Sequence, residues 1–369
     1  MGPTRPRARR LPAAPILSLA LACPVVAQKL PELALRGLDP VELCGGKEVT
    51  GGEDVTAASR RYLYRFSSAA NRERFEKDPA RYEIQFGGGC GRMGPLSGVG
   101  DPTRFAVHDG RIYIFASDSC RRGFLADPAA HLEIEDPIAT GTDVEASAAA
   151  AILAHAVEAI GGARRLDALT TIHFRDEQEQ EYQGRKVPTG TALLLGRDVE
   201  VSSDSWWDAW HVRYRCAKGS SSVLQRTDAK DRGTEWPLAP SQVLALRKLA
   251  LHEPVQVLRM RNRPGFVAFA RRGEGDAATE DRVAVSFVGV TVELSVERRT
   301  GRITGCRYRG RLGTGPNGDV VLGFSDFRDV DGLTLPFTRT ASFGNKEAAT
   351  RRWSRITVDD AADADTFTK

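Results

Sequence analysis

The chain has 369 residues, of which 41% are hydrophobic and 27% are charged, so it is long enough for two domains with separate cores. The formal net charge is only +4, and the four arginines among the first ten residues supply as many positive charges. The remainder is close to neutral with Arg and Glu interspersed, which argues against a nucleic-acid-binding protein.

The first predicted element is a secretory signal peptide at residues 1–27. Basic residues precede a short apolar run, Leu11 to Ala22, and Val25-Val26-Ala27 then suits cleavage by signal peptidase. We expect a soluble protein exported to the periplasm or the extracellular space, because no later segment approaches the ~20 apolar residues that a transmembrane helix needs. Lipid attachment at Cys23 is the less favoured alternative, because Leu21 stands where lipoprotein signals usually carry a small residue.

Five cysteines remain after the predicted cleavage, and their number is odd. They are Cys44, Cys90, Cys120, Cys216 and Cys306. An oxidising compartment favours disulfides. An odd number leaves one thiol free, bound to a metal ion, or paired with another molecule.

The stretch from Leu35 to Leu132 contains two copies of one pattern, forty-nine positions apart and without a gap. Tyr64-Arg65-Phe66-Ser67-Ser68 matches Tyr113-Ile114-Phe115-Ala116-Ser117, and Asp-Pro-Ala follows at 78–80 and at 127–129. The alternation predicts a strand, the last Ser of each motif predicts the N-cap of a helix, and Asp-Pro predicts its end. We therefore expect two equivalent strand-helix units.

Several short motifs of this stretch, taken in order, resemble a YHS domain. They are Leu38-Asp39-Pro40-Val41, Tyr64-x-Phe66-Ser67-Ser68, Asp78-Pro79-x-x-Tyr82 and Gly87-Gly88-x-Cys90. The resemblance implies a small α+β domain over residues 30–132, of a kind often proposed to bind metal. Gly89 departs from the pattern, because exported members often carry Tyr between the second Gly and the Cys.

Three cysteines of this domain form a candidate metal site. Cys120 lies in the first turn of a predicted helix, where free backbone N–H groups stabilise a thiolate, and Arg121 and Arg122 adjoin it. With Cys90 on the glycine-rich loop and Cys44 near the start of the domain, it makes a set of soft ligands suited to copper(I) or zinc(II). One disulfide plus a spare thiol is the alternative.

An acidic stretch, residues 133–143, predicts a linker to a second domain over residues 144–369. Thr142 and Glu145 form a capping box for a helix that ends at Gly161-Gly162. Beyond it, we expect one long curved antiparallel sheet with helices on one face, one of them over Gln242 to Leu251. The candidate strands are 191–201, 211–216, 266–271, 282–297, 302–309, 320–327, 333–343 and 352–358.

Three segments of this second domain are similar to exported proteins with a curved lipoprotein-carrier (LolA-like) sheet. They are the opening helix with Gly161-Gly162, the turn Val330-Asp331-Gly332-Leu333-x-Leu335-Pro336, and the closing stretch from Ile356 to Phe367. The resemblance implies an α+β fold with a half-barrel whose apolar inner face holds a lipid or another apolar ligand.

Two further sets of residues carry predictions for the second domain. Trp206, Trp207 and Trp210 form its densest aromatic cluster, which we expect either to line an apolar pocket or to pack a corner of the sheet. Cys216 and Cys306 are its only cysteines, and both fall in predicted strands of the one sheet. We therefore expect them to form a disulfide.

Signatures of catalysis are missing from the sequence, which has no Gly-x-Ser-x-Gly, His-Glu-x-x-His, phosphate-loop or dinucleotide motif. We therefore expect a non-catalytic binding protein of the cell envelope. Its first domain is predicted to hold a copper or zinc ion or to act as an adaptor, and its sheet to hold an apolar or lipid ligand. The alternatives are a thiol-based redox protein or enzyme that uses Cys90 or Cys120, and a purely structural interaction protein.

Overall fold

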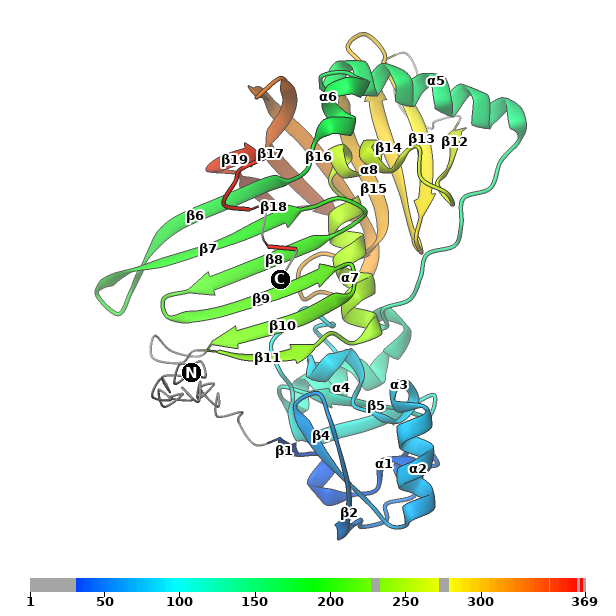
Figure 1. Ribbon diagram of the computed structural model, residues 1–369, viewed down its shortest axis with the longest axis vertical. Coiled ribbons are helices and arrows are strands. Elements are labelled where there is room, and N and C mark those ends of the chain that lie inside the picture. Colours follow the sequence, from blue (N-terminus) through cyan, green and yellow to red (C-terminus); the bar gives the residue numbers. More distant parts are fainter. Residues whose placement is uncertain (1–30, 227–232, 272–278, 345, 364–365, 368–369) are drawn as a thin grey trace, which may run out of the picture. The chain divides into compact units, whose positions relative to one another are not determined.

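The computed structural model describes residues 31–226, 233–271, 279–344, 346–363 and 366–367, which form an α+β fold with mainly antiparallel sheets (Figure 1). The predicted signal peptide at residues 1–27 lies outside the described residues. Among the residues described, no helix is both long enough and apolar enough to cross a membrane.

The N-terminal part, residues 31–132, combines short helices with a three-stranded sheet of order β1-β3-β2 and a two-stranded sheet, β4-β5. Its elements are β1 (Glu32–Leu33), η1 (Leu35–Gly37), α1 (Pro40–Cys44), β2 (Gly52–Ser59), β3 (Tyr62–Phe66), α2 (Ala69–Lys77), α3 (Pro79–Tyr82), η2 (Gln85–Gly88), β4 (Asp101–His108), β5 (Arg111–Phe115), α4 (Asp118–Ala126) and η3 (Pro128–His131). This part is α+β, as expected, whereas its membership of the YHS family stays a prediction.

The two predicted strand-helix units have the same local structure. Ser68 caps α2 and Ser117 caps α4, each by accepting a hydrogen bond of 3.2 Å from the backbone N–H three residues later. Each helix ends at the expected aspartate, Asp78 or Asp127, whose carboxylate caps the short helix that follows. The predicted pseudo-repeat is therefore confirmed. Equivalent aromatic rings meet with centroids 4.8 to 5.3 Å apart: Tyr64–Phe75, Phe66–Phe75, Tyr113–Phe124 and Phe115–Phe124.

The predicted linker has no regular structure, but it is held against the C-terminal part. The Nζ of Lys248 lies 3.0 Å from a carboxylate oxygen of Glu133 and 3.2 Å from one of Asp136. Asp136 also accepts a hydrogen bond of 3.0 Å from the backbone N–H of Thr291. The linker is therefore extended and anchored.

In the C-terminal part, the described residues from Asp143 onward form two seven-stranded antiparallel sheets instead of the single sheet that we expected. The first sheet has the order β11-β10-β9-β8-β7-β6-β19 and the second has the order β12-β13-β14-β15-β16-β17-β18. The elements are α5 (Asp143–Ile160), α6 (Ala163–Ala168), β6 (Ile172–Tyr182), β7 (Arg185–Leu195), β8 (Val201–Trp207), β9 (Trp210–Ala217), β10 (Ser220–Arg226), β11 (Thr234–Pro237), α7 (Pro240–Leu251), α8 (Pro254–Met260), β12 (Val267–Arg271), β13 (Glu280–Phe287), β14 (Val290–Glu297), β15 (Ile303–Arg311), β16 (Asn317–Val330), β17 (Leu333–Phe343), β18 (Lys346–Arg352) and β19 (Arg355–Val358).

The chain passes from the first sheet to the second through α7 and α8, and it returns to the first within the predicted strand 352–358. This run is broken at Trp353, whose buried indole lies 5.3 Å from the ring of Phe174. The chain then changes sheets, because the N–H of Ser354 donates to the carbonyl of Arg175 at 2.8 Å and β19 pairs with β6. A buried aromatic side chain at the crossing point thus separates two strands that the sequence pattern predicts as one.

The helices join the two sheets into one core. The helix α5 begins at the predicted capping box, in which Thr142 Oγ1 accepts from the N–H of Glu145 at 3.3 Å, and it lies along β12 and β13 (Figure 1). The helix α7 contacts β8 and β9 of the first sheet and β14 of the second, so it lies between the sheets (Figure 1). Buried side chains of both sheets and of α5, α7 and α8 form a single apolar cluster.

The expected disulfide between Cys216 and Cys306 is not formed. Cys216 lies in β9 of the first sheet and Cys306 lies in β15 of the second, so the premise of a shared sheet is wrong, and both thiols are free. Burial also raises the pKa of the Cys306 thiol, which keeps it neutral and unreactive.

We expect peptide mapping without reduction to recover Cys216 and Cys306 as free thiols. Treatment with a reducing agent should accordingly leave the melting temperature of the protein unchanged. A mapped peptide that joins the two cysteines would contradict this expectation.

Candidate functional site

Two cavities lie beside α7, and the side chains of Leu96 and Ser97, from the N-terminal part, line both. The smaller cavity has a volume of about 130 Å³, and we call it the tryptophan cavity after its lining residues Trp210 and Trp236. The larger has a volume of about 390 Å³, and we call it the arginine cavity after Arg311, Arg339 and Arg351.

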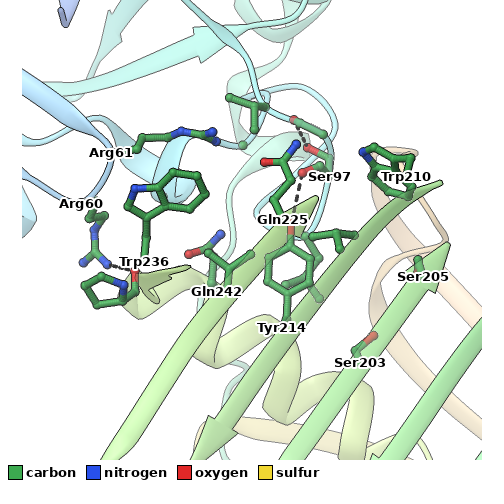
Figure 2. A pocket seen from close by; sticks show the side chains of 18 residues that line it. Arg60, Arg61, Ser97, Ser203, Ser205, Trp210, Tyr214, Gln225, Trp236 and Gln242 are labelled. Atoms are coloured by element: carbon green, nitrogen blue, oxygen red, sulfur yellow. Dashed lines mark hydrogen bonds between the residues drawn. The ribbon is translucent and has the colours of Figure 1, made fainter. Parts of the chain in front are cut away.

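One face of the first sheet forms a wall of the tryptophan cavity. Side chains alternate along a strand, and the register pairs Ser203 with Tyr214 and Ser205 with Val212, so these four line the same side. Figure 2 shows Tyr214 pointing toward Ser97, to whose carbonyl its hydroxyl donates at 3.3 Å. Burial raises the pKa of Tyr214 to about 12, so this hydroxyl keeps its proton and remains a donor.

The turn between β2 and β3 closes the opposite side of this cavity (Figure 2). The guanidinium of Arg61 lies 4.4 Å from the ring centroid of Trp236, a cation–π contact. The neighbouring Arg60 donates to the carbonyl of Pro237 at 2.6 Å and is paired with the buried Glu83 at 3.1 Å. Positive charge therefore lies over an indole at this edge of the cavity.

The glycine-rich loop of the N-terminal part approaches α7 closely. Gly87 has φ +60°, and a Cβ at this position would overlap the side chain of Gln242. Gln242 is buried and donates to the carbonyl of Pro95 at 3.2 Å, while its side-chain oxygen accepts from the N–H of Ala239 at 2.9 Å. A Cβ at Gly89 would lie 2.8 Å from the carbonyl oxygen of Gly94. Close packing thus requires glycine at positions 87 and 89, which explains why Tyr does not stand at position 89.

Of the three tryptophans predicted to bind a ligand, Trp210 lines a cavity. Trp206 is packed over Gly190, and Trp207 is 37% exposed with its ring 6.0 Å from that of Tyr182. Consecutive residues of a strand face opposite sides, so Trp206 and Trp207 cannot line one wall. Trp236 lines the same cavity but was not predicted, because it stands outside any aromatic cluster of the sequence.

The arginine cavity lies between the end of α7 and the second sheet. Lys248 and His252 reach it from the helix side, and Tyr308 of β15 lines its floor. The rings of His252 and Tyr308 are stacked, with centroids 3.5 Å apart and an interplanar angle of 15°. Burial, together with the positive charges of Arg339 and Lys248, holds the pKa of His252 well below its usual range, so the imidazole is neutral.

Arg339 of β17 and Arg351 of β18 are direct cross-strand partners in the wall of this cavity. Arg339 forms an ion pair with Glu253, which is 1% exposed. Both guanidiniums lie over the ring of Trp353, at 5.5 Å and 5.3 Å from its centroid. Burial, and then the positive charge of Arg339, lower the pKa of Arg351. The two arginines therefore lie over one ring and repel each other.

A third arginine joins the N-terminal part to the second sheet. Arg311, at the end of β15, donates to the carbonyls of Arg92 at 3.0 Å, of Gly315 at 2.8 Å, and of His131. Its Nε is buried without a hydrogen-bond partner in the described part of the chain. Arg311 thus holds the loop that lines both cavities.

Comparison with known proteins leaves the family of this chain open. No family model and no curated protein matches it. Among solved structures, it is similar to a DUF1329 family protein from Desulfovibrio piger, with a TM-score of 0.36 and 10% identity over 59% of this chain and 96% of that chain. It is also similar to the LolA superfamily protein NE2245 from Nitrosomonas europaea, with a TM-score of 0.32 and 13% identity over 60% of this chain and 97% of that chain. At these TM-scores neither similarity carries an argument about function.

The three cysteines of the predicted metal site are not all brought together. Cys90 and Cys120 belong to one apolar cluster, whereas Cys44 packs against another. Within the described ranges, no group of three or more His, Cys, Asp or Glu side chains is arranged to hold a metal ion. Copper or zinc binding stays a prediction.

The environment of two of these thiols does not activate them. Burial raises the pKa of Cys90, although its Sγ accepts a hydrogen bond of 3.4 Å from the N–H of Ala116. Burial raises the pKa of Cys44 to about 11. Raised pKa values disfavour the thiolate that redox or nucleophilic chemistry requires, so they count against a thiol-based activity at Cys90.

Proposed function

We propose that this chain is an exported, non-catalytic binding protein whose cavities beside α7 hold a ligand with an apolar body. The arginine cavity carries the proposal, because its volume of about 390 Å³ falls in the range of roughly 300–1,000 Å³ that is usual for small-molecule sites. Its apolar lining includes Leu249, Leu322 and Ala341, and a few charged side chains add specificity. Export is supported by the signal-like pattern of residues 1–27.

The N-terminal part acts as an adaptor in this proposal. Its loop contributes Leu96 and Ser97 to both cavities, and Arg311 and Gln242 hold the loop by hydrogen bonds to the carbonyls of Arg92 and Pro95. A ligand in either cavity would therefore contact both parts of the chain. This role accounts for the glycine-rich loop of the YHS-like stretch without a metal ion.

Filling the arginine cavity should weaken binding. Ala348 and Ala349 are both exposed neighbours on β18, but only Ala349 lines the cavity. We expect Ala349→Trp to weaken the binding of the neutral apolar dye N-phenyl-1-naphthylamine by about tenfold or more, because an indole would occupy the space of the ligand. Fluorescence titration of the mature protein measures this.

The matched substitution Ala348→Trp provides the control. It adds the same indole to the same strand outside the cavity, and we expect it to bind the dye as the wild type does. The proposal fails if the wild type does not bind the dye, or if the two variants bind it equally well.

A further inference from the structure

The Arg339–Arg351 pair by itself destabilises the fold. Like charges directly opposite each other on neighbouring strands destabilise a sheet. The two side chains are directly opposite, and both are partly buried in the wall of the arginine cavity. An arrangement that costs stability and borders a cavity is typical of a binding site.

Nearby acidic groups compensate this pair incompletely. Glu253 forms an ion pair with Arg339, and the carboxylate of Asp176 lies 3.8 Å from Arg351, at the limit of an ion pair. Glu133 also lines the cavity, but it is paired with Lys248. The lining of the cavity includes the positive side chains of Lys248 and Arg311 besides this pair and the negative one of Glu133, so positive charge is in excess there.

The geometry of the pair suits an oxyanion. A guanidinium presents its N–H groups as a planar fork that matches the oxygens of a carboxylate or a phosphate. Both guanidiniums pack over the ring of Trp353, and this contact restricts their side chains before an anion binds. The apolar side chains of Leu249 and Leu322 line the same cavity and are suited to an apolar chain.

We propose that Arg339 and Arg351 bind the oxyanion group of an amphiphile, a carboxylate or a phosphate monoester, whose apolar body occupies the rest of the arginine cavity. This inference rests on the proposed function and names the class of its ligand. It assigns Arg351 the larger role in specificity, because Arg339 is already paired with Glu253.

The test compares dodecanoate with dodecanol by calorimetric titration of the mature protein, with acetate and inorganic phosphate as free anions. We expect dodecanoate to bind about 10- to 100-fold more tightly than dodecanol, the range expected for hydrogen bonds to a charged group. Arg351→Gln should remove this preference and leave the affinity for dodecanol unchanged. Arg351→Lys, which keeps the charge without the fork, should retain part of it.

Arg352→Gln is the matched control, because Arg352 is the exposed neighbour of Arg351 and does not line the cavity. It should leave the preference intact. Equal binding of dodecanoate and dodecanol by the wild type would overturn the oxyanion site while leaving the proposed function standing. Binding of neither would overturn both. If acetate or phosphate binds as tightly as dodecanoate, the site binds free anions, and the proposal of an amphiphilic ligand is wrong.

Discussion

Replacement of Glu253 by alanine will lower the free energy of unfolding by about 3–5 kcal/mol, as is usual when one partner of a buried ion pair is removed. Glu253 is 1% exposed and precedes α8, where it is paired with Arg339. Without it, Arg339 and Arg351 would face each other as partly buried charges of the same sign. Urea denaturation of the variant and the wild type measures the difference.

Two further variants separate loss of the charge pair from loss of packing. The double variant Glu253→Gln with Arg339→Met removes both charges together, and we expect it to be considerably more stable than Glu253→Ala. Glu179→Ala removes an exposed carboxylate, whose ion pair with Lys186 is 3.6 Å long, and it should change stability by less than about 1 kcal/mol. If Glu253→Ala is as stable as Glu179→Ala, the buried carboxylate does not compensate the positive charges of the two arginines.

Replacement of Asp39 by alanine will destabilise the protein by about 3 kcal/mol, through loss of a helix cap and of charged hydrogen bonds. Asp39 is fully buried, and its Oδ1 accepts from the N–H groups of Val41 at 2.8 Å and Glu42 at 3.3 Å. Its Oδ2 accepts from the N–H and Oγ of Ser67, each at 2.8 Å, and from Nδ2 of Asn71 at 2.9 Å. Asp39 thus caps α1 and ties it to the start of α2.

The same residue makes stability depend on pH in acid. Burial raises the pKa of Asp39, but hydrogen bonds from Ser67, Asn71 and Val41 outweigh this and hold the pKa below its ordinary value. Because the folded pKa is the lower one, the stabilisation is present above the unfolded pKa of about 4 and is lost as the pH falls through the folded pKa.

The midpoints of urea denaturation at about pH 3 and about pH 6 test the predicted loss of stability in Asp39→Ala and the predicted pH dependence. The wild type should lose stability at the lower pH. Asp39→Asn, which keeps one acceptor oxygen but no charge, should lie between the wild type and Asp39→Ala at about pH 6 and should depend less on pH. An unchanged pH dependence in Asp39→Asn would assign the acid sensitivity to other carboxylates.

Local features of the fold were predictable from the sequence. The strand Leu333–Phe343 has the bounds that its alternation predicts, and α7 begins only two residues before the predicted Gln242. The caps at Ser68 and Ser117 also follow the pattern. Each of these features depends on residues a few positions apart, since a cap or a turn is formed by neighbours in the chain.

The candidate site was predictable only in part. Trp210 was expected beside a ligand, but the partnership of Arg339 with Arg351 was not. A signal for Arg339 existed, because it occupies an inward position of a strand whose other inward residues are apolar, at 333, 335, 337 and 341. The sequence cannot say which strand lies opposite, and only the pairing of β17 with β18 places Arg351 there.

The sequence by itself determined the strand-helix repeat of the N-terminal part, the capped α5 and the β-rich character of the rest, because backbone geometry and alternation act over short distances along the chain. Only the tertiary structure decided that the strands form two sheets, that Cys216 and Cys306 lie apart, and that two cavities border one loop. These features depend on contacts between distant residues, such as the hydrogen bond from Arg311 to the carbonyl of Arg92, which joins positions 219 residues apart. Many strand pairings satisfy the same local pattern, and the burial of a shared core selects one of them.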